Sequence, residues 1–298
     1  MTWLLKISGS LLALLIMGAV LYGFGGDLAK LDLTSPQTWL QLLAAVGCYV
    51  LVLLLGGVGW KLFLISLGHP LSMREAQRQL LLSQLGKYLP GNVLHFAGRG
   101  AMAIAAGIPA KIIGAALMFE IATSAAAALA TSFTALLLLP DALSVLQGAL
   151  FKNVALFWLI IGLLLGTIGV VGYGAWIRKR SENKITTLHL QPLVGAFGLY
   201  LLSFILLGLS LHLIIGITAP ELKPGLGLSI AVFAIAWVVG LVTPGAPGGL
   251  GVREALVTLG LTPFIGAPAA LTVALTHRAI SVLGDVLAFG LGALLPRR

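Results

Sequence analysis

Apolar residues form long runs along this chain, and the polar residues gather between the runs. Six runs are long enough to cross a bilayer as helices: 3–24, 39–67, 111–139, 154–177, 192–217 and 267–295. About 20 consecutive apolar residues span the hydrocarbon core in this way. The first run is longer than the apolar part of a signal peptide and lacks a small-x-small cleavage site, so we expect it to be retained. The pattern predicts an all-α, polytopic membrane protein with six transmembrane helices.

Two further stretches, 71–109 and 226–263, are apolar but are broken in the middle by proline and glycine. The breaks fall at Pro90-Gly91 and at Pro244-Gly245. Proline removes a backbone donor and glycine favours open turns, so a straight helix is not expected through either stretch. Irregular backbone at membrane depth is tolerated where protein buries it. We predict that each stretch is a re-entrant helical hairpin.

The distribution of Lys and Arg favours this topology, since these residues concentrate in cytoplasmic loops. With two hairpins and the N-terminus inside, eleven of them lie on the cytoplasmic side and three outside. A single crossing by the first stretch would change the split to six against eight. A crossing by the second stretch alone would give nine against five, which leaves that topology open. We expect both termini to be cytoplasmic.

The order of elements predicts an inverted repeat within a single membrane domain, 1–298. Each half, about 1–139 and 150–298, would contain three crossings and one hairpin, and an odd number of crossings reverses the second half. Arg99 follows Pro90 by nine residues, and Arg253 follows Pro244 by the same interval. Inverted repeats with broken helices are a recurrent transporter design.

Composition narrows the function classes. Hydrophobic residues make up 59% of the chain and charged residues 9%, too few charges for a water-facing surface. The net charge of +9 comes mostly from basic residues spaced singly between apolar runs, so no nucleic-acid partner is expected. Cys48 is the single cysteine and lies in an apolar run. We find no metal-ligand cluster, cofactor motif or catalytic motif, and expect no metal, no cofactor and no enzyme activity.

Seven ionisable residues fall at membrane depth and form the candidate charge network: Lys87, Arg99, Glu120, Arg253, Glu254, Arg278 and Asp285. An unpaired charge near the bilayer centre costs about 2.5 to 3.5 kcal/mol. One interpretation is internal pairing, in which Arg278 meets Asp285 on the same helical face and Glu120 meets an arginine of the other half. Whether Glu120, Arg278 and Asp285 are structural or functional stays open.

The two arginines that follow the breaks are candidates for binding an anion. A half-helix beginning at each break would point its free N–H groups and positive dipole end into the protein. An adjacent guanidinium can hold a phosphate with two hydrogen bonds. Candidate substrate-binding residues are therefore Arg99 and Arg253, with Lys87, Gly91, Asn92, His95, Gly245 and Gly249 near them. The alternatives are a structural role for His95 and close packing of small residues for the glycines.

These segments resemble a known family. Residues 85–92 (LGKYLPGN), 95–99 (HFAGR) and 243–255 (TPGAPGGLGVREA) are similar to the two signature segments of the lysylphosphatidylglycerol synthase transmembrane region. This is the flippase-like domain of bacterial MprF proteins, which also occurs as stand-alone proteins. The resemblance covers essentially the whole chain. It implies a protein of the bacterial cell (inner) membrane that moves lipids between leaflets.

This chain also departs from the pattern of the family in two respects. In MprF proteins a soluble aminoacyltransferase domain follows the membrane part, whereas this chain ends at Arg298, so synthase activity is not implied. Family members tend to carry Glu-Arg where this chain has Glu120-Ile121. Relatives suggest a homodimer.

Three hypotheses for the function follow. The first is a lipid flippase or scramblase that moves a lipid with a phosphate headgroup, either a phospholipid or a polyprenyl-phosphate-linked lipid. The second is a non-transporting membrane partner of a lipid-modifying synthase or glycosyltransferase. The third is a membrane enzyme acting on a lipid phosphate, which the sequence supports least.

Overall fold

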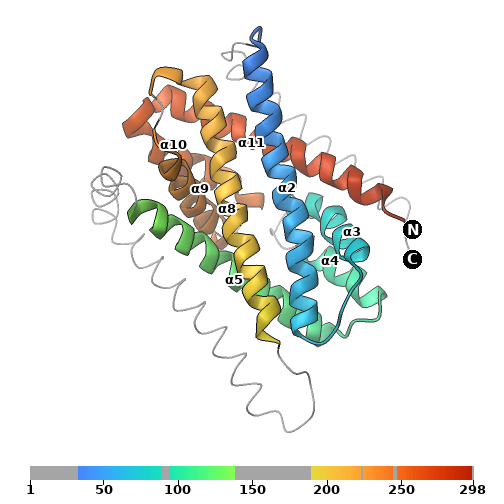
Figure 1. Ribbon diagram of the computed structural model, residues 1–298. Coiled ribbons are helices and arrows are strands. Elements are labelled where there is room, and N and C mark those ends of the chain that lie inside the picture. Colours follow the sequence, from blue (N-terminus) through green and yellow to red (C-terminus); the bar gives the residue numbers. More distant parts are fainter. Residues whose placement is uncertain (1–32, 89–93, 138–188, 223, 244–246, 297–298) are drawn as a thin grey trace.

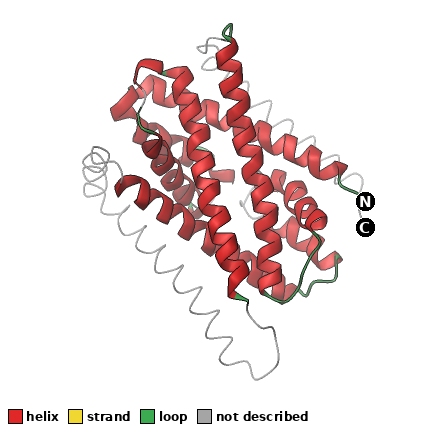
Figure 2. Cartoon of the chain, viewed as in Figure 1, coloured by secondary structure: helices red, strands yellow, loops and turns green. Residues whose placement is uncertain are grey.

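Helices make up all the regular structure in the part of the chain that the computed structural model describes, residues 33–88, 94–137, 189–222, 224–243 and 247–296 (Figure 2). Four of these helices are long and apolar enough to cross a membrane: α2 (Pro36–Ser66), α5 (Ala110–Leu137), α8 (Leu190–Thr218) and α11 (Ala267–Leu294). They confirm four of the six predicted spans. The predicted spans at 3–24 and 154–177 lie outside the described residues, so the total of six stays a prediction.

Large apolar side chains on the outward faces of these four helices are exposed. The clearest are Leu294, Val194, Leu40 and Phe133, with exposed fractions between 64% and 81%. Exposed apolar surface on this scale is unfavourable in water and is expected where lipid is the solvent.

The helices α2 and α8 pack side by side and run antiparallel (Figure 1). Near one end the Ser210 hydroxyl donates a hydrogen bond of 3.1 Å to the Ala45 carbonyl. Further along, Gly59 of α2 lies against the ring of Tyr200. Residue numbers fall along α8 as they rise along α2, which fixes the antiparallel direction. In the predicted topology these two helices are the second crossing of the first half and its counterpart in the second half.

Each of the two broken stretches folds back on itself as a pair of antiparallel helices. The first contains α3 (Met73–Ser83), the 3-10 helix η1 (Gln84–Tyr88) and α4 (Leu94–Ala105). Gly86 lies against the backbone of His95, and Gly98 faces Ser83. The predicted break is confirmed, with residues 89–93 outside the described part. Re-entry of this hairpin into the bilayer stays a prediction.

The second broken stretch contains α9 (Leu226–Val242), η3 (Pro247–Gly249) and α10 (Val252–Ile265). Gly240 lies beside the Arg253 side chain and Gly260 packs against Val232, so α9 and α10 also run antiparallel. Residues 244–246 lie outside the described part. The short helix η2 (Pro220–Leu222) comes between α8 and α9.

Local capping explains where α3 and α10 begin. The Ser72 hydroxyl accepts a hydrogen bond from the Glu75 backbone N–H at the start of α3. At the start of α10, the backbone N–H of Gly251 donates to the Glu254 carboxylate at 2.6 Å. Both arrangements satisfy N–H groups that a helix N-terminus leaves unpaired. The carboxylate of Glu254 is thereby fixed near the second break.

The two halves of the chain interlock. Helix α5 of the first half packs against α9 of the second, and α11 of the second half packs against α3 of the first. The Ser132 hydroxyl of α5 donates to the Ala231 carbonyl of α9, and Gly292 of α11 lies against Leu81 of α3. The tips η1 and η3 also contact each other. An inverted repeat is expected to place a helix of each half against the broken stretch of the other half in this way. The inverted repeat itself stays a prediction.

Candidate functional site

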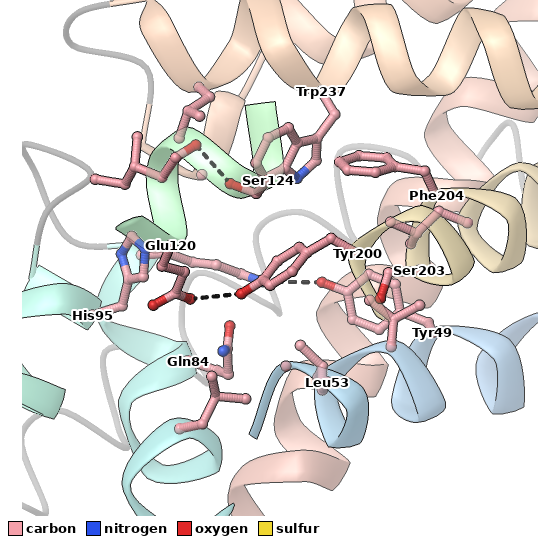
Figure 3. Close-up of a pocket in the computed structure, with 18 of the residues that line it drawn as sticks. Tyr49, Leu53, Gln84, His95, Glu120, Ser124, Tyr200, Ser203, Phe204 and Trp237 are labelled. Atoms are coloured by element: carbon pink, nitrogen blue, oxygen red, sulfur yellow. Dashed lines mark hydrogen bonds between the residues drawn. The ribbon is translucent and has the colours of Figure 1, made fainter. Parts of the chain in front are cut away.

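A cavity of about 180 Å³ lies between α2, the two hairpins, α5 and α8. Its charged lining residues are Lys87, Arg99, Glu120 and Arg253. In Figure 3, Phe204 and Trp237 lie beside each other, while Gln84 and His95 lie on the other side of the cavity. The cavity therefore offers both charged and apolar contacts to a ligand, and it brings together residues of both halves.

Arg99 is 2% exposed and forms an ion pair with Glu120 of α5. Both terminal nitrogens of the guanidinium donate to the carboxylate, one of them at 3.1 Å. The Tyr200 hydroxyl of α8 donates to the same carboxylate at 3.1 Å (Figure 3). The guanidinium carbon also lies 4.5 Å from the centre of the Trp60 ring of α2. This cluster joins four helices, and its positive charge is already neutralised.

Two expectations about this pair were wrong. Arg99 is the sixth residue of α4, so it does not lie in the first turn of that helix, where the sequence had placed it. Glu120 pairs with an arginine of its own half and not with one of the other half. The absence of an arginine at Ile121 does not prevent this pairing, because Arg99 approaches from α4.

A second ion pair joins the first hairpin to α11. The Lys87 ammonium of η1 lies 2.7 Å from the Asp285 carboxylate, which is fully buried. The hydroxyls of Tyr49 and Tyr88 also donate to Asp285, the first at 3.2 Å. Lys87 in turn donates to the Tyr49 hydroxyl at 2.9 Å. Close approach is possible because Gly284 has no side chain where the Tyr49 ring lies.

A third ion pair joins the second hairpin to the same helix. The Arg278 guanidinium lies 3.5 Å from Glu254 and donates to the Gly248 carbonyl at 3.0 Å. It also lies over the Tyr88 ring of the first hairpin, 5.4 Å from the ring centre. Helix α11 therefore holds the tips of both hairpins.

The expected pair of Arg278 and Asp285 does not form. Although both lie on α11 seven residues apart, each carries its charge to a different hairpin. Each side chain instead pairs with a residue of another helix, because it points away from α11 toward that neighbouring helix.

Arg253 is the second residue of α10, in the first turn, as the break in the sequence predicts. Its guanidinium lies against Gly249, about 3.3 Å from the position that a Cβ atom would take. The buried Nε has no hydrogen-bond partner. No ion pair involving Arg253 occurs among the described residues, whereas the other three cations of the charge network each have a carboxylate partner. Arg253 therefore borders the cavity without an ion-pair partner in the described part of the chain.

The other residues that were predicted to bind the substrate lie in different places relative to the cavity. His95 borders the cavity, and its buried Nδ1 has no hydrogen-bond partner. Gly248, and not Gly249, lines the cavity, while Gly249 makes room for the Arg253 side chain. Gly91, Asn92 and Gly245 lie outside the described residues.

The sequence reasoning missed the tyrosines that complete the charge clusters. Tyr49 and Tyr200 lie in the interior of long apolar helices, and both hydroxyls donate to buried carboxylates. Tyrosines of membrane proteins are enriched at the interfaces, so a tyrosine in mid-span is a signal of a buried polar partner. Gln84 and Ser124, which also line the cavity, carry no comparable signal.

The four long apolar helices, with buried charge clusters between them, define a multi-pass membrane protein. The chain belongs to the family described as lysylphosphatidylglycerol synthase TM region, whose model matches residues 3–288. No curated protein matches the chain. The family resemblance is therefore confirmed, and it places the protein among membrane proteins related to lipid handling.

Proposed function

We propose that this protein is a lipid flippase or scramblase that moves an anionic, phosphate-bearing lipid between the leaflets of a bacterial-type inner membrane. The observation that carries the proposal is the uncompensated guanidinium of Arg253 at the edge of a cavity deep among apolar helices. An unpaired cation in such surroundings is unfavourable unless an anion binds there. Arginine is suited to phosphate, which it holds with two hydrogen bonds.

The size of the cavity favours entry of a headgroup alone. Its volume of about 180 Å³ is below the roughly 300 to 1,000 Å³ of sites that enclose a drug-sized ligand. Acyl chains would stay in the surrounding lipid, against the apolar outer faces of the helices. No bond is made or broken in this mechanism, and no cofactor is required.

The two hairpins supply the moving parts in this proposal. With each hairpin re-entering the membrane from its own side in an inverted repeat, a headgroup at Arg253 would reach both leaflets by the rocking of one half against the other. Cytoplasmic termini, a homodimer and association with a lipid-modifying enzyme belong to the same proposal.

Transbilayer movement in liposomes tests the proposal. The purified protein is reconstituted with a trace of acyl-labelled fluorescent phosphatidylglycerol, and dithionite quenches the label in the outer leaflet. The wild-type protein should make nearly all the label accessible, and Arg253→Gln should slow this at least about tenfold, the factor that a loss of 1.4 kcal/mol produces. Arg74→Gln is the matched control, because Arg74 is an exposed cation on α3.

Equal rates for Arg253→Gln and the wild type would reject the mechanism. Absence of movement with the folded wild-type protein would reject transport altogether. Co-purification with a synthase or glycosyltransferase, together with that absence, would favour the non-transporting partner.

A further inference from the structure

We infer that the cavity selects lipid phosphodiesters that carry one negative charge and no ammonium group. This inference rests on the proposed function, which it deepens by specifying the charge of the headgroup. It follows from the charge balance of the described residues around the cavity and from the ion pair that each carboxylate already forms.

The charge network of the described residues contains four cations and three carboxylates. Three neutral pairs form: Lys87 with Asp285, Arg99 with Glu120, and Arg278 with Glu254. Arg253 remains, so the site has a surplus of one positive charge. Because buried charge is unfavourable in apolar surroundings, a ligand of charge −1 gives the neutral complex. A dianion leaves a surplus of one negative charge.

Each carboxylate of the charge network already has a cationic partner, so a ligand ammonium group would have to compete with that partner. Glu120 accepts from both terminal nitrogens of Arg99 and from Tyr200. Asp285 is fully buried behind Lys87, and Glu254 accepts from the Gly251 backbone N–H in addition to pairing with Arg278. A zwitterionic headgroup would therefore bring its ammonium group into the cavity without an unpaired carboxylate among the described residues to neutralise it, which is unfavourable.

The same reasoning applies to the lipid in the family's name. A lysyl ester of phosphatidylglycerol carries ammonium groups beside its phosphodiester, whereas Glu120, the one carboxylate among the described lining residues, is already paired with Arg99. We infer that this chain prefers the lipid without the lysyl group.

The phosphodiester is assigned to a lipid and not to a soluble compound. Large apolar side chains such as Leu40, Phe133 and Val194 are exposed on the outer faces of the helices around the cavity. Acyl chains attached to the headgroup would contact these faces while the headgroup occupies the cavity, which favours a lipid. A soluble phosphodiester such as dimethyl phosphate shares the charge but lacks this contribution.

The inference is tested by comparing four acyl-labelled lipids in the same liposome measurement: phosphatidylglycerol, phosphatidylcholine, lysyl-phosphatidylglycerol and phosphatidic acid. At pH 8 phosphatidic acid is mostly a dianion, since the second pKa of a phosphate monoester is about 6. Phosphatidylglycerol should move at least about tenfold faster than each of the other three. An excess of dimethyl phosphate should leave its rate unchanged.

Variants that change the net charge sharpen the test. Arg253→Gln removes the surplus charge and should abolish the preference for phosphatidylglycerol over phosphatidylcholine. The double variant Arg99→Gln/Glu120→Gln removes one charge of each sign and should keep the preference. Glu120→Gln alone raises the surplus to two and should shift the preference toward phosphatidic acid. If this last variant does not fold, the first two still decide the question.

The outcomes separate this inference from the proposed function. Movement of all four lipids at the same rate would overturn the charge selectivity and leave lipid transport standing. Movement of none would reject the proposed function. Strong inhibition by dimethyl phosphate would overturn the assignment to a lipid, and loss of selectivity in the double variant but not in Arg253→Gln would overturn the role of the surplus charge.

Discussion

Arg99 and Arg253 occupy corresponding places after the two breaks, but their surroundings differ. Arg99 is almost completely buried in mid-helix, where Glu120 neutralises it and Trp60 covers it. Arg253 is half-buried in the first turn of α10, has no ion-pair partner among the described residues, and lies over glycines. Equal spacing in sequence therefore does not give equal roles.

The difference separates charges that link helices through ion pairs from a charge without such a pair among the described residues, which we propose is the one that binds a ligand. A paired arginine at membrane depth contributes by linking elements, and removing its partner leaves an unfavourable buried charge. An arginine without a partner gains favourable interactions only when an anion binds. Mutations of paired residues should therefore lower stability, and mutations of Arg253 should lower transport.

The largest loss of stability is expected from Asp285→Asn. The largely buried Lys87 ammonium would be left without a carboxylate, and the three donors Lys87, Tyr49 and Tyr88 would lose their charged acceptor. Unfolding in detergent micelles should show a loss of about 3 to 5 kcal/mol. The control Glu221→Gln removes an exposed carboxylate and should change stability by less than about 0.5 kcal/mol. Equal stability of the two variants would contradict the proposed anchoring role of α11.

Glu120→Gln should have the next largest effect, because it leaves Arg99 unpaired. We expect a loss of about 2 to 4 kcal/mol in the same measurement, against less than about 1 kcal/mol for Arg253→Gln. The reverse order would show that Arg253, and not Arg99, is held by the fold.

Gly249→Ala tests the position of the Arg253 side chain. The backbone of Gly249 has a φ of 74°, and a Cβ atom there would lie 3.3 Å from the guanidinium. We expect a loss of about 1 to 2 kcal/mol in stability and slower lipid movement. Gly198→Ala on α8 is the matched control, since no atom lies within 4 Å of its Cβ position. Unchanged transport by Gly249→Ala would show that the side chain has room elsewhere.

Tyr200→Phe should have the smallest effect. It removes one hydrogen bond to Glu120 and leaves the ion pair with Arg99 in place. We expect a loss of about 1 kcal/mol. A loss as large as that of Glu120→Gln would mean that the hydroxyl, and not Arg99, is the main partner of the carboxylate.

The four described spans and the two breaks could be predicted because each depends on residues close together in sequence. An apolar run determines its own helix, and proline with glycine determines the interruption. The need to compensate the buried charges was also predictable. The identity of the partners was not, because Lys87 and Asp285 are 198 residues apart and meet only through the packing of α3 and α11.

Depth in the membrane can be read from a hydropathy pattern, but the direction of a side chain around its helix depends on the neighbouring helices. For this reason Arg278 and Asp285 suggested a pair on one face, while the fold directs them to different hairpins. Tyr49 and Tyr200, in the middle of apolar helices, were a local signal of buried polar partners that the sequence-based prediction did not use.

The most direct measurement of the central claim is native mass spectrometry of the protein purified with phosphatidylglycerol. The wild type and Arg99→Gln/Glu120→Gln should each retain one anionic lipid, because both keep Arg253 uncompensated, whereas Arg253→Gln should lose it. Retention by Arg253→Gln, with loss from the double variant, would contradict the account.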